Sequence, residues 1–391
     1  MMKIVKSSLH TFECSNKRVF LRVDLNVALQ EGKIISDFRL KAIMPTLELL
    51  LKKGAKIILA THIGRPQGTN HELTTQHLIP WFIKQGYSIT YEPDLLKAYK
   101  KSFEAQSTIL LLENLRFYPG EKNEDPVFAQ SLGALADFYV NDAFGLMHRT
   151  DCSLYALPLL FPASGRSVGL LVEREIDTIE NLFNNKSHPF VCIIGGLKVK
   201  EKLAFINYLL PKIDLLILVP AMVFSFLKAK GQETGNSFID NDALKICSTI
   251  MENATRLNKK IIMPLDYLVS ANKNFATLTN KQLDEFNVSD IGITIGSATQ
   301  KQISTIISKA KLCLYNGLMG FMEYPHTLQG VDAIFKAMGS MPGKSIVAGG
   351  DSVAAIQALG YEENIDFMST AGGALLSFLT DHPMPALELY R

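Results

Sequence analysis

Ten short apolar runs alternate with longer stretches of helical periodicity, and this alternation constrains the fold more than any other feature of the chain. The runs lie near 18–23, 57–61, 109–113, 138–141, 191–195, 215–219, 261–264, 312–315, 345–348 and 366–369. Most show no polar–apolar alternation, which is typical of strands buried on both faces of a parallel sheet. Segments such as 37–53, 125–136 and 201–210 are predicted to be the intervening helices. The repeated pattern indicates right-handed β–α–β crossovers.

The number of runs also predicts the domain organisation. A chain of 391 residues is too long for one ordinary core. Ten strands exceed the roughly six of a usual sheet. We therefore expect an α/β protein with two doubly wound, Rossmann-like parallel-sheet domains joined by a helical hinge. The predicted division is a first domain over 1–167, a connecting helix within 168–185 that includes 168–176, and a second domain over 186–371.

Composition excludes several classes of protein. Hydrophobic residues make up 47% of the chain and charged residues 20%, as in a folded globular protein. The net charge of +2 and the lack of a basic run argue against nucleic-acid binding. The N-terminus has no apolar signal segment, and the most apolar stretch, 209–226, is interrupted by proline and charged residues. The 5 cysteines include no C-x-x-C pair, which favours free thiols in a reducing cytoplasm.

In the first half of the chain, polar side chains follow the predicted strands. Asp24 and Asn26 follow one strand, while His62, Arg65 and Arg116 follow others. The carboxyl ends of parallel strands meet at one edge of a sheet, and guanidinium groups bind phosphate or carboxylate through paired hydrogen bonds. Together with Arg39 and Arg149, these residues predict an anion site. For any one of them alone, a solvated surface arginine or an Asx turn is the simpler interpretation.

In the second half, the strands end in glycines. The turns are G-G-L-K at 195–198, G-G-D-S at 349–352 and T-A-G-G at 370–373. Glycine lets the backbone approach a phosphate, and a helix N-terminus favours anions. An N-cap role for Asp351 or Ser352 is the alternative. G-x-G-x-x-G is absent, and the Walker-like 339–345 is one residue short and precedes its strand.

These motifs, in this order, resemble phosphoglycerate kinases over essentially the whole chain. The first half carries R-V-D-L-N-V at 22–27, D-F-R at 37–39, T-H-I-G-R-P at 61–66, E-N-L-R-F at 113–117, N-D-A-F-G at 141–145 and H-R at 148–149. The second half carries G-G-L-K-V at 195–199 with Lys202, N-G at 316–317, M-G at 319–320 with Glu323, G-G-D-S at 349–352, and S-T at 369–370 followed by G-G-A at 372–374.

The resemblance implies reversible phosphoryl transfer between 1,3-bisphosphoglycerate with ADP and 3-phosphoglycerate with ATP, as in glycolysis and gluconeogenesis. It implies that the substrate is bound by Asp24, Leu25, Asn26, Arg39, His62, Ile63, Gly64, Arg65, Arg116 and Arg149. It implies that the nucleotide is bound by Gly196, Lys198, Lys202, Asn316, Glu323, Gly349, Gly350, Asp351 and Ser352. The implied catalytic residues are Arg39, Lys198, Lys202, Gly372 and Gly373.

The resemblance also implies Mg²⁺ as the cofactor, held by Asp351, and ribose binding by Glu323. It implies that 372–391 returns to the first domain, whose ligand is the phosphoglycerate, and that the cleft closes about hinge segments near 168–176 and 370–374. The implied partners are the small-molecule substrates alone, without nucleic acid or membrane. We expect a cytoplasmic monomer.

Several positions depart from the family pattern, and nearly all lie in the second half. The first-half departure is Ala28, where the family usually has proline. In the second half, V-P-A at 219–221 replaces a glycine triplet, and the other departures are Leu197, Ser297, Leu318, Ala348 and Ala371. The charged set is intact, so we expect retained chemistry with a reshaped base pocket. The alternatives are a degenerate relative that binds an anion or a protein without turnover, and a sugar-phosphate transferase of similar build.

Overall fold

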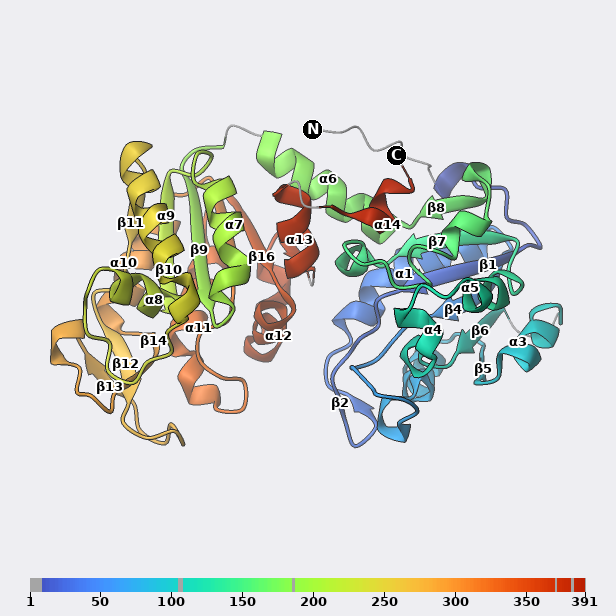
Figure 1. The fold of residues 1–391 in the computed structure, drawn as a ribbon, viewed down its shortest axis with the longest axis horizontal. Coiled ribbons are helices and arrows are strands. Elements are labelled where there is room, and N and C mark those ends of the chain that lie inside the picture. The colour runs from blue at the N-terminus through green and yellow to red at the C-terminus, as the bar shows by residue number, and fades with distance from the viewer. Residues whose placement is uncertain (1–8, 105–107, 185–186, 370, 381–382, 391) are drawn as a thin grey trace. The chain divides into compact units, whose positions relative to one another are not determined.

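The computed structural model of the chain describes residues 9–104, 108–184, 187–369, 371–380 and 383–390. Their contacts group into two compact units, with the division in the chain after Leu182. The end of the chain belongs to the first unit, where the amide of Ala386 donates to the carbonyl of Met147 at 3.2 Å. Figure 1 shows a sheet flanked by helices in each unit.

The first unit contains a parallel sheet of six strands in the order β5-β6-β4-β1-β7-β8. The strands are β1 Arg18–Val23, β4 Lys56–Ala60, β5 Ile89–Glu92, β6 Ile109–Leu112, β7 Phe138–Asp142 and β8 Arg166–Val168, with a small hairpin of β2 Leu29–Gln30 and β3 Lys33–Ile34. The helices are α1 Phe38–Lys52, α2 Ile79–Lys84, α3 Leu95–Ser102, α4 Pro119–Lys122, α5 Pro126–Gly133, α6 Leu170–Asn184 and α14 Pro385–Glu388.

Strand register places the candidate residues of this unit at one sheet edge. Arg22 of β1 pairs with Ala60 of β4 on one side and with Asn141 of β7 on the other. The residues that follow β1 and β4 therefore leave the sheet side by side. The chain order of the strands reverses between β1 and β7, and ligands of open α/β sheets bind at such a point.

The second unit has a six-stranded parallel sheet in the order β11-β10-β9-β15-β16-β17. Its strands are β9 Phe190–Gly196, β10 Leu215–Ala221, β11 Lys260–Ile262, β15 Leu312–Asn316, β16 Lys344–Ala348 and β17 Phe367–Ser369; β12 Tyr267–Ser270, β13 Thr279–Lys281 and β14 Ile291–Ile295 form a smaller antiparallel sheet. The helices are α7 Val199–Leu209, α8 Met222–Ala229, α9 Leu244–Arg256, α10 Ser297–Ile307, α11 Gln329–Gly339, α12 Gly350–Leu359 and α13 Gly372–Leu379. Its order corresponds to the 3-2-1-4-5-6 arrangement of nucleotide-binding sheets, with the reversal between β9 and β15.

Each sheet is embedded in its own core, because its strands are apolar on both faces. In the second unit, Ile193 of β9 and Tyr315 of β15 pack with Ile303 of α10 and Phe335 of α11, and all four side chains are fully buried. In the first unit, Leu21 and Leu59 pack with the apolar face of α1. The prediction of two parallel-sheet α/β domains is confirmed.

Three details differ from the sequence-based expectation. Strands β5 and β8 were not predicted, because both are edge strands and shorter or less uniformly apolar than the central ones. The connecting helix α6 begins at Leu170 and not at Val168, because Val168 ends β8. The small antiparallel sheet of β12, β13 and β14 was also missed. Of the two predicted hinge segments, Thr370 lies outside the described residues.

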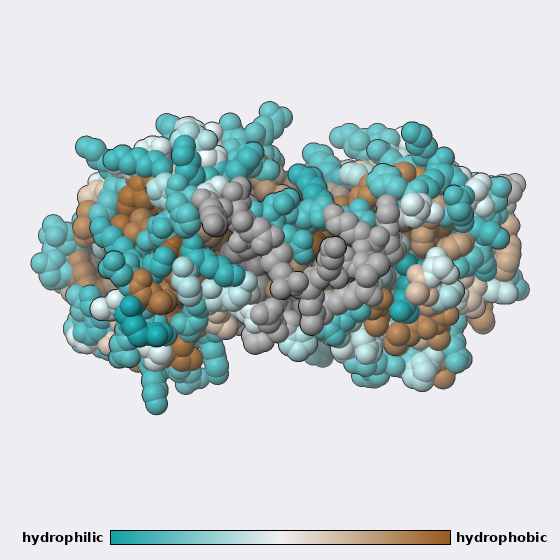
Figure 2. Space-filling view, turned by 90° about the horizontal axis from the view of Figure 1, so that it is seen from above, coloured by the Kyte–Doolittle hydropathy of each residue, from teal (hydrophilic) through white to brown (hydrophobic). Residues whose placement is uncertain are grey.

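On the face shown in Figure 2, most of the coloured surface is hydrophilic, and hydrophobic residues occur in small scattered groups. No helix within the described part of the chain is both long enough and apolar enough to cross a membrane.

Candidate functional site

The first candidate site lies where β1 and β4 of the first unit end, and its side chains are charged. Asp24 follows β1 and forms an ion pair with Arg39, in the first turn of α1. Burial by itself raises the pKa of Asp24, but its interactions with Arg39, His62 and Arg22 lower it to about 2. The carboxylate is therefore ionised at neutral pH, and it holds the Arg39 guanidinium at the sheet edge.

The loop that follows β4 is fixed by hydrogen bonds to its backbone. The amide of Gly64 donates to Asn26 Oδ1 at 2.8 Å, and the carbonyl of Gly64 accepts from Arg116 Nη1 at 2.5 Å. Asn114 Nδ2 donates to the carbonyls of Ile63 and Leu73, both at 2.8 Å. Gly64 has a φ of +65°, a backbone conformation that would be strained in a residue with a side chain. These contacts orient a loop that carries Arg65.

His62 and Arg116 lie deep in this site, among several positive charges. His62 is fully buried, and burial lowers its pKa well below 6.5. The charge of Asp24 opposes this shift, whereas the charges of Arg22, Arg116 and Arg149 reinforce it. Burial also lowers the pKa of Arg116, and Arg149 adds to that effect. A group of positive side chains this close together is suited to bind an anion.

The remaining predicted residues of this site differ in how they could contribute. Arg65 is exposed, and its guanidinium is available to a ligand from solvent. Leu25 and Ile63 are buried in the core, so only their backbone groups could reach a ligand. The Leu25 amide already donates to Thr61 Oγ1 at 2.9 Å.

The second candidate site is a pocket of about 530 Å³ in the second unit, at the reversal between β9 and β15. It is lined by all of the residues that the sequence analysis assigned to nucleotide or to catalysis in this half: Gly196, Lys198, Lys202, Asn316, Glu323, Gly349, Gly350, Asp351, Ser352, Gly372 and Gly373. The structure therefore gathers three separate glycine turns around one cavity.

Two of the helices that begin at this pocket, α7 and α12, lack side-chain caps. Helix α12 begins after Gly349, which has no side chain, and the N-cap residue of α7, Lys198, makes no capping hydrogen bond. Helix α10, which starts elsewhere, has its first amides bound by the carboxylate of Asp266, at 3.0 Å for Ala298 and 2.8 Å for Thr299. Uncapped amides and the positive end of the helix dipole form an anion-binding site.

Two of the glycine turns approach each other closely. A Cβ atom added to Gly372 would lie 2.9 Å from the Cα of Gly349, so the two backbones meet where no side chain fits. Gly349 has a φ of +109°, in the region that favours glycine. The N-termini of α12 and α13 can therefore both approach one ligand.

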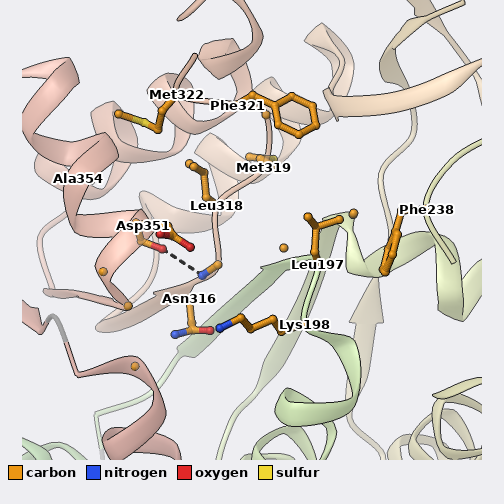
Figure 3. A pocket seen from close by; sticks show the side chains of 18 of the residues that line it. Leu197, Lys198, Phe238, Asn316, Leu318, Met319, Phe321, Met322, Asp351 and Ala354 are labelled. Carbon is orange, nitrogen blue, oxygen red and sulfur yellow. Dashed lines mark hydrogen bonds between the residues drawn. The ribbon is translucent and has the colours of Figure 1, made fainter. Parts of the chain in front are cut away.

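Polar side chains line the end of the pocket nearest these turns. Lys202 is buried, and its Nζ donates to the carbonyl of Gly195 at 2.6 Å. Asn316 Nδ2 donates to the carbonyl of Ala348 at 2.8 Å, whereas its Oδ1 is buried without a partner among the described residues. Figure 3 shows Lys198, Asn316 and Asp351 on this side of the pocket.

The donor set at this end fits Mg²⁺ bound together with phosphates, but not a metal held by protein alone. The described residues contain no group of three or more His, Cys, Asp or Glu side chains that could hold a metal ion. Mg²⁺ commonly takes one or two carboxylates and completes its shell with water and phosphate oxygens. Asp351, exposed in the first turn of α12, and the unpartnered Asn316 Oδ1 provide oxygens of the required kind.

The opposite end of the pocket is apolar. Leu318, Phe321 and Met322 lie on one side of it, and Leu197 and Phe238 lie on another (Figure 3). Leu197 and Phe238 are 53% and 44% exposed, so the walls have apolar surface that a ligand could cover. The lining includes Leu197, Ala221 and Leu318, which depart from the family pattern. Phe238 was missed from the sequence, where nothing in its surroundings marks it as a pocket residue.

Sequence reasoning also missed two groups of buried polar residues in the first unit. Arg22 belongs to a quoted motif but was given no role; it is fully buried with Glu121. Asp142 accepts hydrogen bonds from the amides of Leu171 and Val172 at 2.9 and 3.2 Å, and so caps α6. Only the rarity of a charged residue inside an apolar run could have drawn attention to Arg22.

Comparison with known proteins gives the family of the chain. The family model described as phosphoglycerate kinase matches residues 9–382. A phosphoglycerate kinase from Koribacter versatilis (strain Ellin345) is 37% identical over 399 residues, covering 98% of each chain. A cytosolic phosphoglycerate kinase from Triticum aestivum is 36% identical over 385 residues, covering 96% of this chain and 95% of the relative.

Solved structures give the same result. The phosphoglycerate kinase from Pyrococcus horikoshii OT3 has a TM-score of 0.85 at 30% identity, covering 98% of each chain. The phosphoglycerate kinase from Coxiella burnetii has a TM-score of 0.81 at 28% identity, covering 99% of each chain. The chain therefore belongs to the phosphoglycerate kinase family of phosphotransferases.

Proposed function

We propose that the chain catalyses the reversible transfer of a phosphoryl group between 1,3-bisphosphoglycerate and ADP, giving 3-phosphoglycerate and ATP. The observation that carries this proposal is the pocket of the second unit, where two lysines, a carboxylate and glycine-rich helix N-termini surround one cavity. Such a cavity suits a polyphosphate. No observation favours the alternatives of a binding protein without turnover or a sugar-phosphate transferase.

In the first unit, we assign the phosphoglycerate to the charged site. Arg65, Arg116 and Arg149 would bind its anionic groups, since guanidinium groups pair with phosphate and carboxylate oxygens. His62 and Asn26 would bind its polar groups. Arg39, held by Asp24, would contact the transferring phosphoryl group.

In the second unit, we assign the nucleotide to the pocket. Lys198, Lys202 and the amides at Gly349 and Gly350 would bind its phosphates, and Glu323 would bind the ribose. Asp351 would hold Mg²⁺, which neutralises phosphate charge when it is bound. The apolar end of the pocket would take the base.

The chemistry requires positioning and charge neutralisation but no covalent intermediate. Arg39, Lys198 and the amides at Gly372 and Gly373 would neutralise the equatorial oxygens as negative charge spreads over them. Preorganised donors of this kind usually make the largest single contribution to catalysis.

Transfer in line requires the reacting atoms to lie about 3–3.5 Å apart, whereas product release requires access to solvent. We therefore propose that the first domain (1–167) and the second (186–371) close about the connecting helix within 168–185 and a second hinge near 370–374. Small-angle scattering should show compaction with both ligands and less with either alone. An unchanged radius of gyration with saturating 3-phosphoglycerate and nucleotide would argue against closure.

We further propose that the protein works as a cytoplasmic monomer whose partners are its small-molecule substrates. Two relatives, from Triticum aestivum and Nicotiana tabacum, are named as cytosolic. The near-neutral net charge of +2 supports the expectation that nucleic acid is not a partner.

A coupled assay tests the proposed function. Purified protein with 3-phosphoglycerate and Mg-ATP should form 1,3-bisphosphoglycerate, and omission of magnesium should stop it. The matched control is Lys198→Ala, which removes one phosphate-binding charge from the pocket. Turnover no higher than that of this variant would contradict the proposal and support binding without catalysis.

A further inference from the structure

A buried polar network connects β1, α4 and the turn that carries Ser153 to His62. Arg22 of β1 and Glu121 of α4 are both fully buried, with 3.7 Å between Arg22 Nη2 and Glu121 Oε1. Arg22 Nε donates to Ser153 Oγ at 2.8 Å, and Ser153 Oγ in turn donates to Glu121 Oε1 at 2.7 Å. The Ser153 amide donates to Glu121 Oε2 at 2.9 Å. The network fixes the plane of the guanidinium.

One guanidinium nitrogen of this network lies against the His62 ring. Arg22 Nη2 is 3.4 Å from His62 Nδ1, and Nη1 of the same side chain donates to the carbonyl of Val23. A guanidinium carries donors and no acceptor, so His62 Nδ1 must be the acceptor in this contact. A hydrogen on Nδ1 would point at an Arg22 N–H. In the neutral ring the hydrogen therefore resides on Nε2.

The surroundings of His62 also oppose a second proton on the ring. Burial lowers its pKa most, and the charges of Arg22, Arg116 and Arg149 lower it further. The charge of Asp24 opposes this shift, but Asp24 is already paired with Arg39. The ring stays neutral where an unperturbed histidine, with a pKa of about 6.5, would be half protonated.

We propose that Arg22 is a positioning residue that locks His62 as the neutral Nε2–H tautomer, so that His62 presents a fixed N–H donor to an oxygen of 3-phosphoglycerate. The identity of the ligand rests on the proposed function, but the tautomer does not. His62 then binds without exchanging a proton, and its contribution to substrate affinity does not change with pH near 6.5.

The first test measures the wild-type protein without substrate, so that the result does not depend on activity; a variant is needed only to assign the His62 signal. Nitrogen NMR of protein labelled in its 8 histidines, with His62 assigned by its loss in His62→Gln, should show Nδ1 unprotonated and Nε2 protonated from about pH 5.5 to 8. A hydrogen on Nδ1, or a ring that becomes doubly protonated in this range, would overturn the proposal.

The second test removes the Arg22 donor while keeping the buried charge balanced. In Arg22→Met with Glu121→Gln, the His62 signal should become a mixture of the two neutral tautomers. Affinity for 3-phosphoglycerate, measured by calorimetry, should fall about tenfold, as for one hydrogen bond to a charged group. Glu121→Gln alone keeps Arg22 and should keep the wild-type tautomer.

The two variants and the two readouts separate the possible failures. If the double variant keeps the wild-type tautomer and the wild-type affinity, Arg22 does not position His62 and the proposal is wrong. If the tautomer changes while wild-type protein shows no affinity for 3-phosphoglycerate, the proposed function is wrong but the lock stands. If the double variant does not fold, the wild-type NMR result still decides.

Discussion

The two candidate sites present different parts of the chain to a ligand. In the first unit the candidate groups are side chains: Arg39 pairs with Asp24, Arg116 donates to the carbonyl of Gly64, and His62 lies against Arg22. In the second unit much of the pocket wall is backbone, with Gly349 and Gly372 at the starts of two helices. The first site depends on the charges of its side chains, and the second depends on how closely a ligand can approach the backbone.

The difference extends to how each unit treats its helix N-termini. In the first unit, the carboxylate of Asp142 occupies the start of α6. In the second unit, the starts of α7 and α12 have no side-chain cap, whereas α10, which begins away from the pocket, is capped by Asp266. Helix amides that must bind a ligand cannot also be bound by a capping carboxylate, because the two would compete for the same hydrogen bonds.

The largest effect should come from the first site. Arg39→Ala removes the guanidinium that we place on the transferring group, so kcat should fall on the order of a hundredfold or more. Steady-state kinetics measure this. Lys41→Ala is the matched control, since Lys41 lies on the same helix in an exposed pair with Asp37 at 3.0 Å. Equal losses in the two variants would show that Arg39 acts only through the helix.

The second site should be sensitive to a single methyl group. Gly372→Ala places a Cβ 2.9 Å from the Gly349 Cα, where neither backbone can yield cheaply. A shift of about 1 Å at reacting groups can cost a hundredfold, so we expect kcat to fall at least tenfold. Gly373→Ala meets nothing within 4 Å and should cost less. A larger loss of kcat in Gly373→Ala than in Gly372→Ala would mean that the direction of the amides matters more than the close approach of the two backbones.

Arg65 should contribute to substrate binding but not to the rate of the chemical step. Arg65→Ala removes an exposed charge that we expect to hold the non-reacting phosphate equally in the ground and transition states. The KM for 3-phosphoglycerate should rise about tenfold, while kcat changes by less than about threefold. A large fall in kcat with an unchanged KM would exchange the roles given to Arg65 and Arg39.

The base end of the pocket tests how far the backbone site tolerates substitution. Ala221 and Leu318 line it where the family pattern has glycine and proline. Calorimetry with ADP, GDP and pyrophosphate should show retained pyrophosphate binding and a preference for ADP over GDP of less than about a hundredfold, because an apolar wall discriminates weakly. A stronger preference for adenine would mean that backbone shifts absorb these substitutions.

Among the changes proposed, substitution of Asp142, which caps α6, should affect turnover least. Its expected effect is on the pH dependence of stability. Burial raises the pKa of Asp142 to about 7, against hydrogen bonds from Thr46 and the α6 amides that lower it. The folded state then keeps a proton that the unfolded chain loses above about pH 4, so stability falls as pH rises from about 4 to 7. Urea unfolding of wild type should show this slope, and Asp142→Asn should reduce it. Identical pH profiles would mean that Asp142 ionises normally.

The sequence alone determined the fold class and the membership of each site. Uniformly apolar runs predict buried parallel strands. The residues that follow parallel strands all lie at the same edge of the sheet. That rule placed Asp24 and His62 together, and the three glycine turns together, before any coordinates. Strands β5 and β8 escaped prediction because their sequences, I-T-Y-E and R-S-V, are short and lack the uniform apolar signal.

Only the tertiary structure decided which residues that are distant in the sequence contact each other. Arg22, Glu121 and Ser153 lie far apart in the sequence, and nothing in their local patterns indicates a buried network. The approach of Gly372 to Gly349, and the entry of Phe238 into the pocket wall, depend on how separate β–α units pack. Periodicity reports which face of an element is buried; it does not report which distant residue that face meets, because that contact is set by the packing of the whole domain.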